Sequence, residues 1–168
     1  MKIIVCVDEN YGIGKDNSIP WHISADMKHF KNTTMGHTVC MGYNTLMSLP
    51  GGKPLEGRDN IILWDQEGEI EGCRVVHSKE QLLDAVRDLP TDEVFITGGA
   101  SVYKMMLPYC DEVILTMVEG VYECDTFFPN LRKLDNWKRR QVSETYEENG
   151  IKYHFEIHNN TNLIGHFL

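Results

Sequence analysis

Short apolar runs with helical patterns between them most constrain the fold of this chain. The run over residues 2–7 is continuously apolar after its first residue, Lys2, as in a strand that is buried on both faces of a sheet. Further strand-like runs start at residues 37, 60, 73, 93 and 112, and helical patterns cover residues 24–34, 78–89 and 100–107. Strands that alternate with helices form parallel sheets, so the sequence predicts an α/β fold.

The end of the chain has a different pattern. Residues 139–147 and 151–158 alternate like strands and flank the turn sequence "ENG", which predicts an antiparallel hairpin. We therefore expect one domain over residues 1–168, with a predominantly parallel central sheet of about eight strands, flanking helices and a C-terminal hairpin. The tail over 159–168 either packs back, contacts a second chain or is disordered.

Charge and composition exclude several classes of partner. The net charge of -9 argues against binding to nucleic acid or to an anionic membrane. No run approaches 18 apolar residues, and the N-terminal run is too short for a signal peptide, so we expect a cytoplasmic protein that does not span a membrane. The five cysteines form no CxxC pair and the seven histidines no HExxH motif, so we expect neither a disulfide framework nor a metal site.

Two strand–glycine–helix junctions indicate a phosphate site. Gly98 and Gly99 precede the helix at 100–107, and Gly42 precedes a short helix with Asn44 and Thr45 as candidate caps. Glycine lets the backbone approach a phosphate, and the N–H groups of the following helix point at it. Tight packing or ordinary capping explains either junction alone, whereas the two together suit a pyrophosphate between two helix N-termini.

The helix at 24–34 carries an acid on an otherwise apolar face. Asp26 shares that face with Ile23, Met27 and Phe30, and Ser24 is a candidate N-cap. An acid in a first helical turn can simply favour the helix dipole. It can also lie in an apolar pocket and bind one cationic or amidine-like ligand group. The loop over 10–21 leads directly to this helix and is either a lid over a site or an ordinary surface loop.

An ordered set of short motifs resembles the dihydrofolate reductase family from about residue 2 to 158. The set comprises "GIG" at 12, "IPW" at 19, Asp26 with Phe30 and Lys31, "MG" and Thr45, "PLEGR" at 54, "NIIL" at 60, "GGASVY" at 98, "LT" at 115 and "DTFFP" at 125. The resemblance implies reduction of 7,8-dihydrofolate to tetrahydrofolate by hydride transfer from a reduced nicotinamide, in support of one-carbon and thymidylate metabolism. It also implies a monomer that binds antifolate inhibitors.

The resemblance assigns roles to individual residues. Asp26 would bind the pterin ring, Thr116 would contact Asp26, and Trp21 would hold the ordered water that delivers a proton to N5. Arg58 would bind the α-carboxylate of the glutamate tail, for which a fork of donors is well suited. The other substrate-binding residues are Ile4, Cys6, Met27, Phe30, Lys31, Leu49, Lys53, Leu55 and Ile96, although core packing also explains the apolar ones.

The resemblance implies NADPH as the cofactor and leaves NADH possible. The matching cofactor-binding residues are Cys6, Ile13, Gly14, Ile19, Gly42, Tyr43, Asn44, Thr45, Leu63, Trp64, Asp65, His77, Ile96, Gly98, Gly99, Ala100, Ser101, Val102, Tyr103 and Thr126. Tyr43 replaces a common basic residue, and Trp64-Asp65 stands where small or basic residues are usual. Only His77 remains to meet the 2′-phosphate, so we expect a weaker preference for NADPH over NADH than is usual in the family.

Two other interpretations share these features. One is a different pteridine or pyrimidine reductase on the same fold, such as the reductase of the riboflavin pathway. The other is a nucleotide-binding module without catalysis. Asp26 and Arg58 favour folate over the first alternative, and the joint presence of Asp26, Trp21 and the paired glycines argues against the second.

Overall fold

The computed structural model describes residues 1–164 and is built around one mixed sheet, which has nine strands within that range. The strand order is β10-β11-β7-β1-β6-β3-β4-β5, and β9 also pairs with β11. The strands are β1 (Lys2–Asp8), β3 (Thr38–Gly42), β4 (Asp59–Leu63), β5 (Cys73–Val76), β6 (Val94–Gly98), β7 (Glu112–Val118), β9 (Trp137–Val142), β10 (Tyr146–Glu148) and β11 (Ile151–Asn160). A separate two-stranded sheet joins β2 (Gly12–Gly14) to β8 (Thr126–Phe127).

The predicted fold class is confirmed. The six strands from β5 to β7 pair in parallel, and β11 joins β7 in the antiparallel direction. The segment predicted as one strand over 139–147 is divided into β9 and β10, and both pair with β11. Because β1 lies in the middle of the sheet, the first apolar run of the sequence forms the centre of the core.

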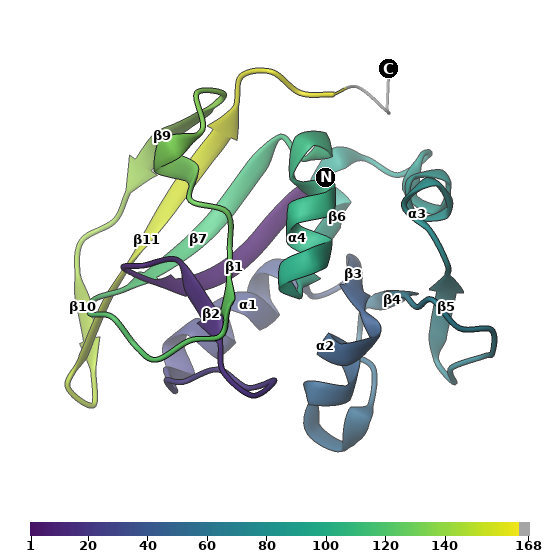
Figure 1. Cartoon of the computed structure of the whole chain (residues 1–168), viewed down its shortest axis with the longest axis horizontal. Helices are drawn as coiled ribbons and strands as arrows, with labels where there is room; N and C mark the ends of the chain where they lie inside the picture. Colours follow the sequence, from purple (N-terminus) through teal and green to yellow (C-terminus); the bar gives the residue numbers. More distant parts are fainter. Residues whose placement is uncertain (165–168) are drawn as a thin grey trace.

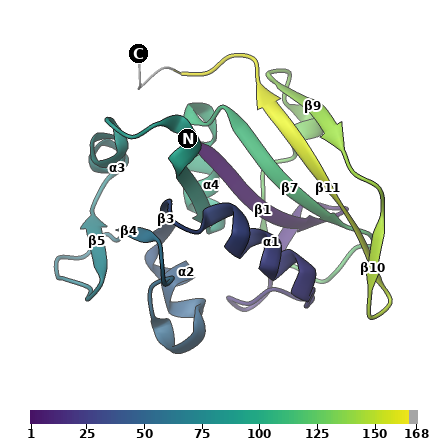
Figure 2. The same ribbon diagram turned by 180° about the vertical axis from the view of Figure 1, so that it is seen from behind.

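Helices cover both faces of this sheet. They are α1 (Ser24–Thr34), α2 (Tyr43–Ser48), α3 (Lys79–Val86) and α4 (Ala100–Met106), with short 3-10 turns at η1 (Pro50–Gly52), η2 (Thr91–Glu93), η3 (Leu107–Tyr109) and η4 (Leu131–Lys133). Helix α4 lies in front of the sheet in Figure 1, and α1 lies on the opposite face, in front in Figure 2. The bounds of α1 confirm the helix predicted over 24–34. Helix α3 ends at Val86, three residues before the end of the predicted pattern.

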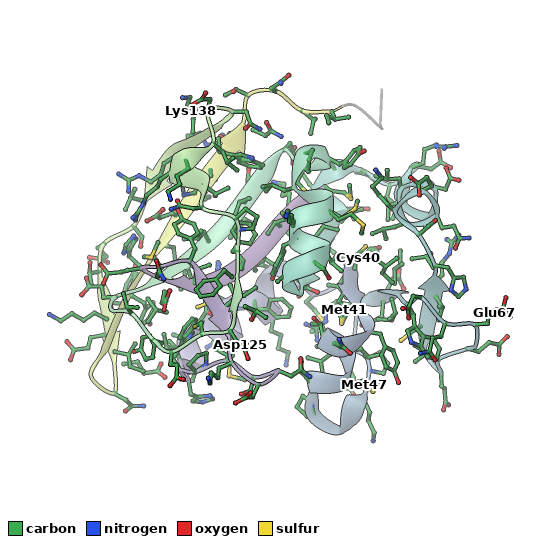
Figure 3. All side chains as sticks on the ribbon, in the orientation of Figure 1. Cys40, Met41, Met47, Glu67, Asp125 and Lys138 are labelled. Atoms are coloured by element: carbon green, nitrogen blue, oxygen red, sulfur yellow. The ribbon has the colours of Figure 1, made fainter. Side chains whose placement is uncertain are left out.

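The strands divide the core between the two faces. Cys40 and Met41 are consecutive residues of β3, and both are buried (Figure 3). Cys40 packs in the larger apolar cluster with Met106 of α4, whereas Met41 packs in the cluster that includes Phe30 of α1 and Leu46 of α2. Adjacent strand residues point to opposite faces, so one apolar run supplies both halves of the core.

Ser24, Asn44 and Thr45 do not cap the helices as the sequence predicted. Helix α1 has Ile23 at its N-cap, and the N–H of Ser24 donates to a glutamate from the hairpin instead. Helix α2 has Gly42 at its N-cap, so Asn44 and Thr45 lie inside its first turn. Ser78 does cap α3 by accepting a hydrogen bond from the N–H of Gln81, but the side chain of Gln81 bonds the N–H of His77 rather than completing the capping box.

The described part of the tail packs back onto the molecule. The N–H of Thr161 donates to the carbonyl of Asn136 at 2.7 Å, and that of Ile164 donates to the carbonyl of Pro108 at 3.0 Å. The last four residues of the predicted tail, 165–168, lie outside the described residues. Over residues 1–164, no helix is long and apolar enough to cross a membrane.

A buried carboxylate of β11 lies between two histidines of the same strand. The side chain of Glu156 on β11 is 3% exposed, and its oxygens lie 2.6 Å from Nε2 of His154 and 2.8 Å from Nε2 of His158. Arg139 on β9 lies 3.8 Å from the same carboxylate. Burial alone would raise the pKa of Glu156, but the hydrogen bonds with His158 and His154 outweigh it and lower the pKa to about 2.

We predict that Glu156 makes the fold sensitive to acid. An unfolded glutamate has a pKa of about 4.3, so the lowered pKa stabilises the folded state at neutral pH by about 2–3 kcal/mol. That stability is lost as the pH falls from about 5 toward 2. Glu156→Gln should therefore unfold at lower urea concentration at pH 7 and lose less stability on acidification than the parent, whereas exposed Glu144→Gln should match the parent. Equal acid sensitivity in all three proteins would contradict this assignment.

Candidate active site

A short hydrogen bond joins the acid of α1 to the sheet. The hydroxyl of Thr116, a buried residue of β7, donates to Oδ1 of Asp26 at 2.6 Å. Asp26 is half-buried, so its second oxygen remains available to a ligand. A carboxylate held in this way can accept paired hydrogen bonds from a ligand that presents two donors side by side. Asp26 is thus fixed by a strand of the sheet as well as placed in the first turn of α1.

Trp21 and Cys6 border this acid. The indole N–H of Trp21 donates to Sγ of Cys6 at 3.2 Å, and the edge of its ring packs against Tyr122 at a centroid distance of 5.2 Å. Cys6 is the register partner of Thr116 across the β1–β7 pair. Burial, followed by the nearby charge of Asp26, raises the pKa of the Cys6 thiol well above its usual value. Cys6 is therefore a neutral thiol rather than a nucleophile.

Most of the apolar residues expected around the substrate lie together. Ile4, Phe30, Leu49 and Leu55 belong to or pack against one cluster on the α1 face of the sheet. Met27 on the same helix is 59% exposed and lies outside this cluster. These residues form an apolar wall that extends from Asp26 toward η1.

The structure separates Ile96 from this wall. Its side chain is fully buried and packs in the cluster on the α4 face. The next residue, Thr97, is half-buried where the register of β6 against β3 shifts, and its hydroxyl donates to the carbonyl of Cys40 at 3.3 Å. Thr97 is thus a better candidate for ligand contact, and sequence reasoning missed it. The alternation of side chains along β6 is the signal that points to it.

Arg58 is oriented by hydrogen bonds at the far end of the wall. Its Nε donates to the carbonyl of Glu56 at 2.9 Å, and one terminal nitrogen donates to the hydroxyl of Thr34 at 3.2 Å. Burial lowers the pKa of Arg58 although the charge of Glu56 opposes the shift, and an arginine remains cationic at neutral pH. The other expected cations, Lys31 and Lys53, are exposed. Arg58 is therefore a pre-oriented cation beside the apolar wall.

The two strand–glycine–helix junctions lie side by side. Gly98 pairs in register with Met41, the residue before Gly42. Gly98 has φ +132°, and a Cβ on Gly99 would lie 3.1 Å from Oγ1 of Thr45. Helices α2 and α4 start at these junctions with glycine at both N-caps, so no N-cap side chain occupies the N–H groups of their first turns. The expected juxtaposition of the two junctions is confirmed.

The loop over residues 9–23 is held beside these junctions. Buried Asp8 accepts hydrogen bonds from the N–H groups of Asn10, Gly12 and Tyr122, and sequence reasoning missed this role. A Cβ on Gly12 would lie 2.5 Å from Sγ of Cys124, so the loop needs glycine there. The side chain of Asn17 reaches the carbonyl of Asn44 at the start of α2.

The other residues that the resemblance assigns to the cofactor differ in their exposure. Tyr103 is buried, and its hydroxyl donates to the carbonyl of Ile4 at 2.8 Å, so it supports β1 rather than lining an open surface. Val102 is also buried. Gly14 is buried as well. The remaining residues lie along the loop, at strand ends and at the start of α4, and they are partly or fully exposed: Ile13, Ile19, Leu63, Ala100, Ser101 and Thr126.

An aromatic pair lies at the end of β4. The rings of Tyr43 and Trp64 stack at a centroid distance of 4.6 Å with an interplanar angle of 10°. Nδ1 of exposed His77 lies 2.9 Å from the carbonyl of Trp64, so the three expected residues are neighbours. Exposed Asp65 begins a loop that also carries three acids, of which Glu67 projects at the outer edge in Figure 3; the others are Glu69 and Glu71.

Comparisons with known proteins agree with this geometry. The family model described as dihydrofolate reductase matches residues 1–160. The dihydrofolate reductase of Staphylococcus haemolyticus is 38% identical over 161 residues, which cover 94% of each chain. That of Bacillus subtilis is 34% identical over 158 residues, which cover 94% of this chain and 91% of the relative.

A solved structure gives the same result for the fold. Dihydrofolate reductase from Enterococcus faecalis, in complex with NADP(H) and RAB-propyl, superposes with a TM-score of 0.82 at 29% identity and covers 95% of each chain. The family model spans nearly the whole described chain, and the Asp26–Thr116 pair, the apolar wall and the paired glycines lie within it. This chain therefore belongs to the dihydrofolate reductase family.

Proposed function

We propose that this chain reduces 7,8-dihydrofolate to 5,6,7,8-tetrahydrofolate and that Asp26 binds the pterin ring. The observation that carries the proposal is the 2.6 Å hydrogen bond from Thr116, which fixes the carboxylate beside an apolar wall. The second carboxylate oxygen and the lone pairs left on the first can accept N3–H and the 2-amino group of the pterin. These hydrogen bonds would fix the orientation of the pterin ring beside the apolar wall.

The proton and the hydride arrive by separate routes. Reduced nicotinamide supplies the hydride to C6 when it is bound. The negative charge of Asp26 favours a protonated pterin, and a water beside Trp21 delivers the proton to N5. The indole N–H of Trp21 is directed at Cys6, so its ring closes one side of the site and helps exclude bulk water.

The residues around the two glycine junctions fit a dinucleotide. Their glycines leave room for a pyrophosphate, and the first turns of α2 and α4 offer N–H groups. NADPH is the family's cofactor, and the relative from Enterococcus faecalis was solved with NADP(H). We propose in addition that NADH is used, because neutral Tyr43 and acidic Asp65 stand at the adenosine end.

The proposal extends to the location, the oligomeric state and the inhibitors of the protein. All five cysteines are free, as in proteins of a reducing compartment, which supports a cytoplasmic location. We propose that the chain acts as a monomer with one domain over residues 1–168, and that antifolates bind at Asp26.

Asp26→Asn should reduce the rate of dihydrofolate reduction at pH 7. The substitution keeps the size of the side chain but removes a charge-assisted acceptor worth roughly 1.5–3 kcal/mol, which corresponds to about ten- to a hundredfold in kcat/KM. The loss should shrink at low pH, where the substrate is protonated without help. Steady-state kinetics against pH measure both effects, with exposed Asp88→Asn as the control. A normal rate for Asp26→Asn at pH 7 would show that Asp26 is only a helix-terminal acid.

Arg58→Lys should raise KM for dihydrofolate more than it lowers kcat, because the glutamate tail lies far from the reacting carbon. A lysine cannot reproduce the guanidinium fork that Thr34 and the carbonyl of Glu56 now orient. A pterin substrate without the tail should be reduced equally well by the parent and the variant. Exposed Arg87→Lys is the control, and equal damage to tailed and tailless substrates would make Arg58 a structural residue.

Tyr43→Arg should increase the preference for NADPH over NADH. A new ionic hydrogen bond to the 2′-phosphate is worth roughly 1.5–3 kcal/mol. The measurement is kcat/KM for both cofactors, with Gln141→Arg as a charge-matched control. A strong preference for NADPH in the parent that persists in His77→Ala would show that another basic group binds the phosphate.

A further inference from the structure

The N-terminus of α1 lacks a cap of its own. Its N-cap residue, Ile23, is 2% exposed and packs with Trp21, Val118 and Tyr153, so this position serves the core. The N–H groups of Asp26 and Met27 bond the carbonyl of Ile23 at 3.1 and 3.2 Å. The N–H groups of Ser24 and Ala25 cannot find partners within the helix.

One carboxylate from the hairpin meets both of these groups. Oε2 of Glu148 accepts the N–H of Ser24 at 2.6 Å, and Oε1 accepts the N–H of Ala25 at 3.2 Å. Oε1 also accepts the hydroxyl of Ser24 at 2.9 Å. These hydrogen bonds lower the pKa of Glu148, as does the nearby His22, so the carboxylate stays ionised during catalysis at neutral pH. An anion at this end of a helix also complements the helix dipole.

Glu148 and Thr116 belong to the same part of the sheet. Glu148 ends β10, which pairs with β11, and β11 pairs with β7 so that Phe155 lies opposite Thr116. Figure 2 shows the β10 hairpin beside the N-terminal end of α1. The sheet therefore contacts the first turn of α1 at two points: Thr116 bonds the side chain of Asp26, and Glu148 bonds the backbone of the two residues before it.

We propose that Glu148 is a positioning residue for dihydrofolate reduction, which acts by fixing the first turn of α1 and thereby the carboxylate of Asp26. This inference rests on the proposed role of Asp26. A carboxylate that receives paired hydrogen bonds must lie within a few tenths of an ångström of its productive place, and the hydrogen bond from Thr116 fixes one oxygen of Asp26 but not the backbone of the first turn. The three contacts from Glu148 remove that freedom.

The test is a double-mutant cycle in the full-length protein. Kinetics are measured for the parent, Glu148→Ala, Asp26→Asn and the double variant, with Glu147→Ala as the matched control on the same hairpin. Glu148→Ala should lower kcat/KM for dihydrofolate by about tenfold, as for the loss of roughly one or two hydrogen bonds. The KM for NADPH should stay within about twofold of the parent, because a positioning effect is local to Asp26. In the Asp26→Asn background, the same substitution should change kcat/KM by less than about twofold, since residues that act as a unit are not additive.

Several results would overturn the proposal. Glu148→Ala with the activity of Glu147→Ala would show that the contacts do not matter, and an equal loss in both backgrounds would show a general structural effect. Asp26→Asn with normal activity would remove the proposed role of Asp26 itself, and the single variant alone reveals that case. If Glu148→Ala does not fold, Glu148→Gln, which keeps one acceptor oxygen, replaces it in the cycle and should show a smaller loss with the same dependence on Asp26.

Discussion

The hydrogen bond between Thr116 and Asp26 joins the helix that carries the acid to the strand beside the centre of the sheet. The apolar wall has its place because α1 packs on the face that carries Ile4, and the pairing of β3 with β6 brings the two glycine junctions together. A carboxylate on an apolar face is costly unless it is hydrogen-bonded. The hydroxyl of Thr116 supplies that hydrogen bond and also fixes the orientation of the Asp26 carboxylate.

The elements that sequence reasoning found are those whose signal is local. Continuous apolar runs identified β1, β3, β4, β6 and β7, and paired glycines identified the junctions at Gly42 and Gly98. The resemblance singled out Asp26, Thr116 and Arg58, and in the structure Thr116 bonds Asp26 while Thr34 helps to orient Arg58. The role of each residue in catalysis stays a prediction.

The features that sequence reasoning missed depend on distant partners. Glu148, which bonds the first N–H groups of α1, lies 124 residues after Ser24 in the sequence. The residues around Ile23 do not indicate this partner, because Ile23 occupies the N-cap position for its packing in the core. The burial of Glu156 likewise depends on how β11 pairs within the sheet, although its two histidine partners lie only two residues away on the same strand. The division between Ile96 and Thr97 follows the alternation of side chains along β6, but which of the two packs toward α4 depends on how β6 lies in the sheet. Tertiary context thus accounts for the differences, as it generally overrides local propensity.

Oxidation of NADPH by the purified chain on addition of dihydrofolate is the measurement that tests the central claim most directly. Hydride transfer predicts that NADPH is consumed only when dihydrofolate is present, one for each tetrahydrofolate formed, with a turnover on the order of 1–1,000 per second, as for a typical enzyme. Tight binding of NADPH without its oxidation after dihydrofolate is added would contradict the account and would identify a nucleotide-binding module without catalysis.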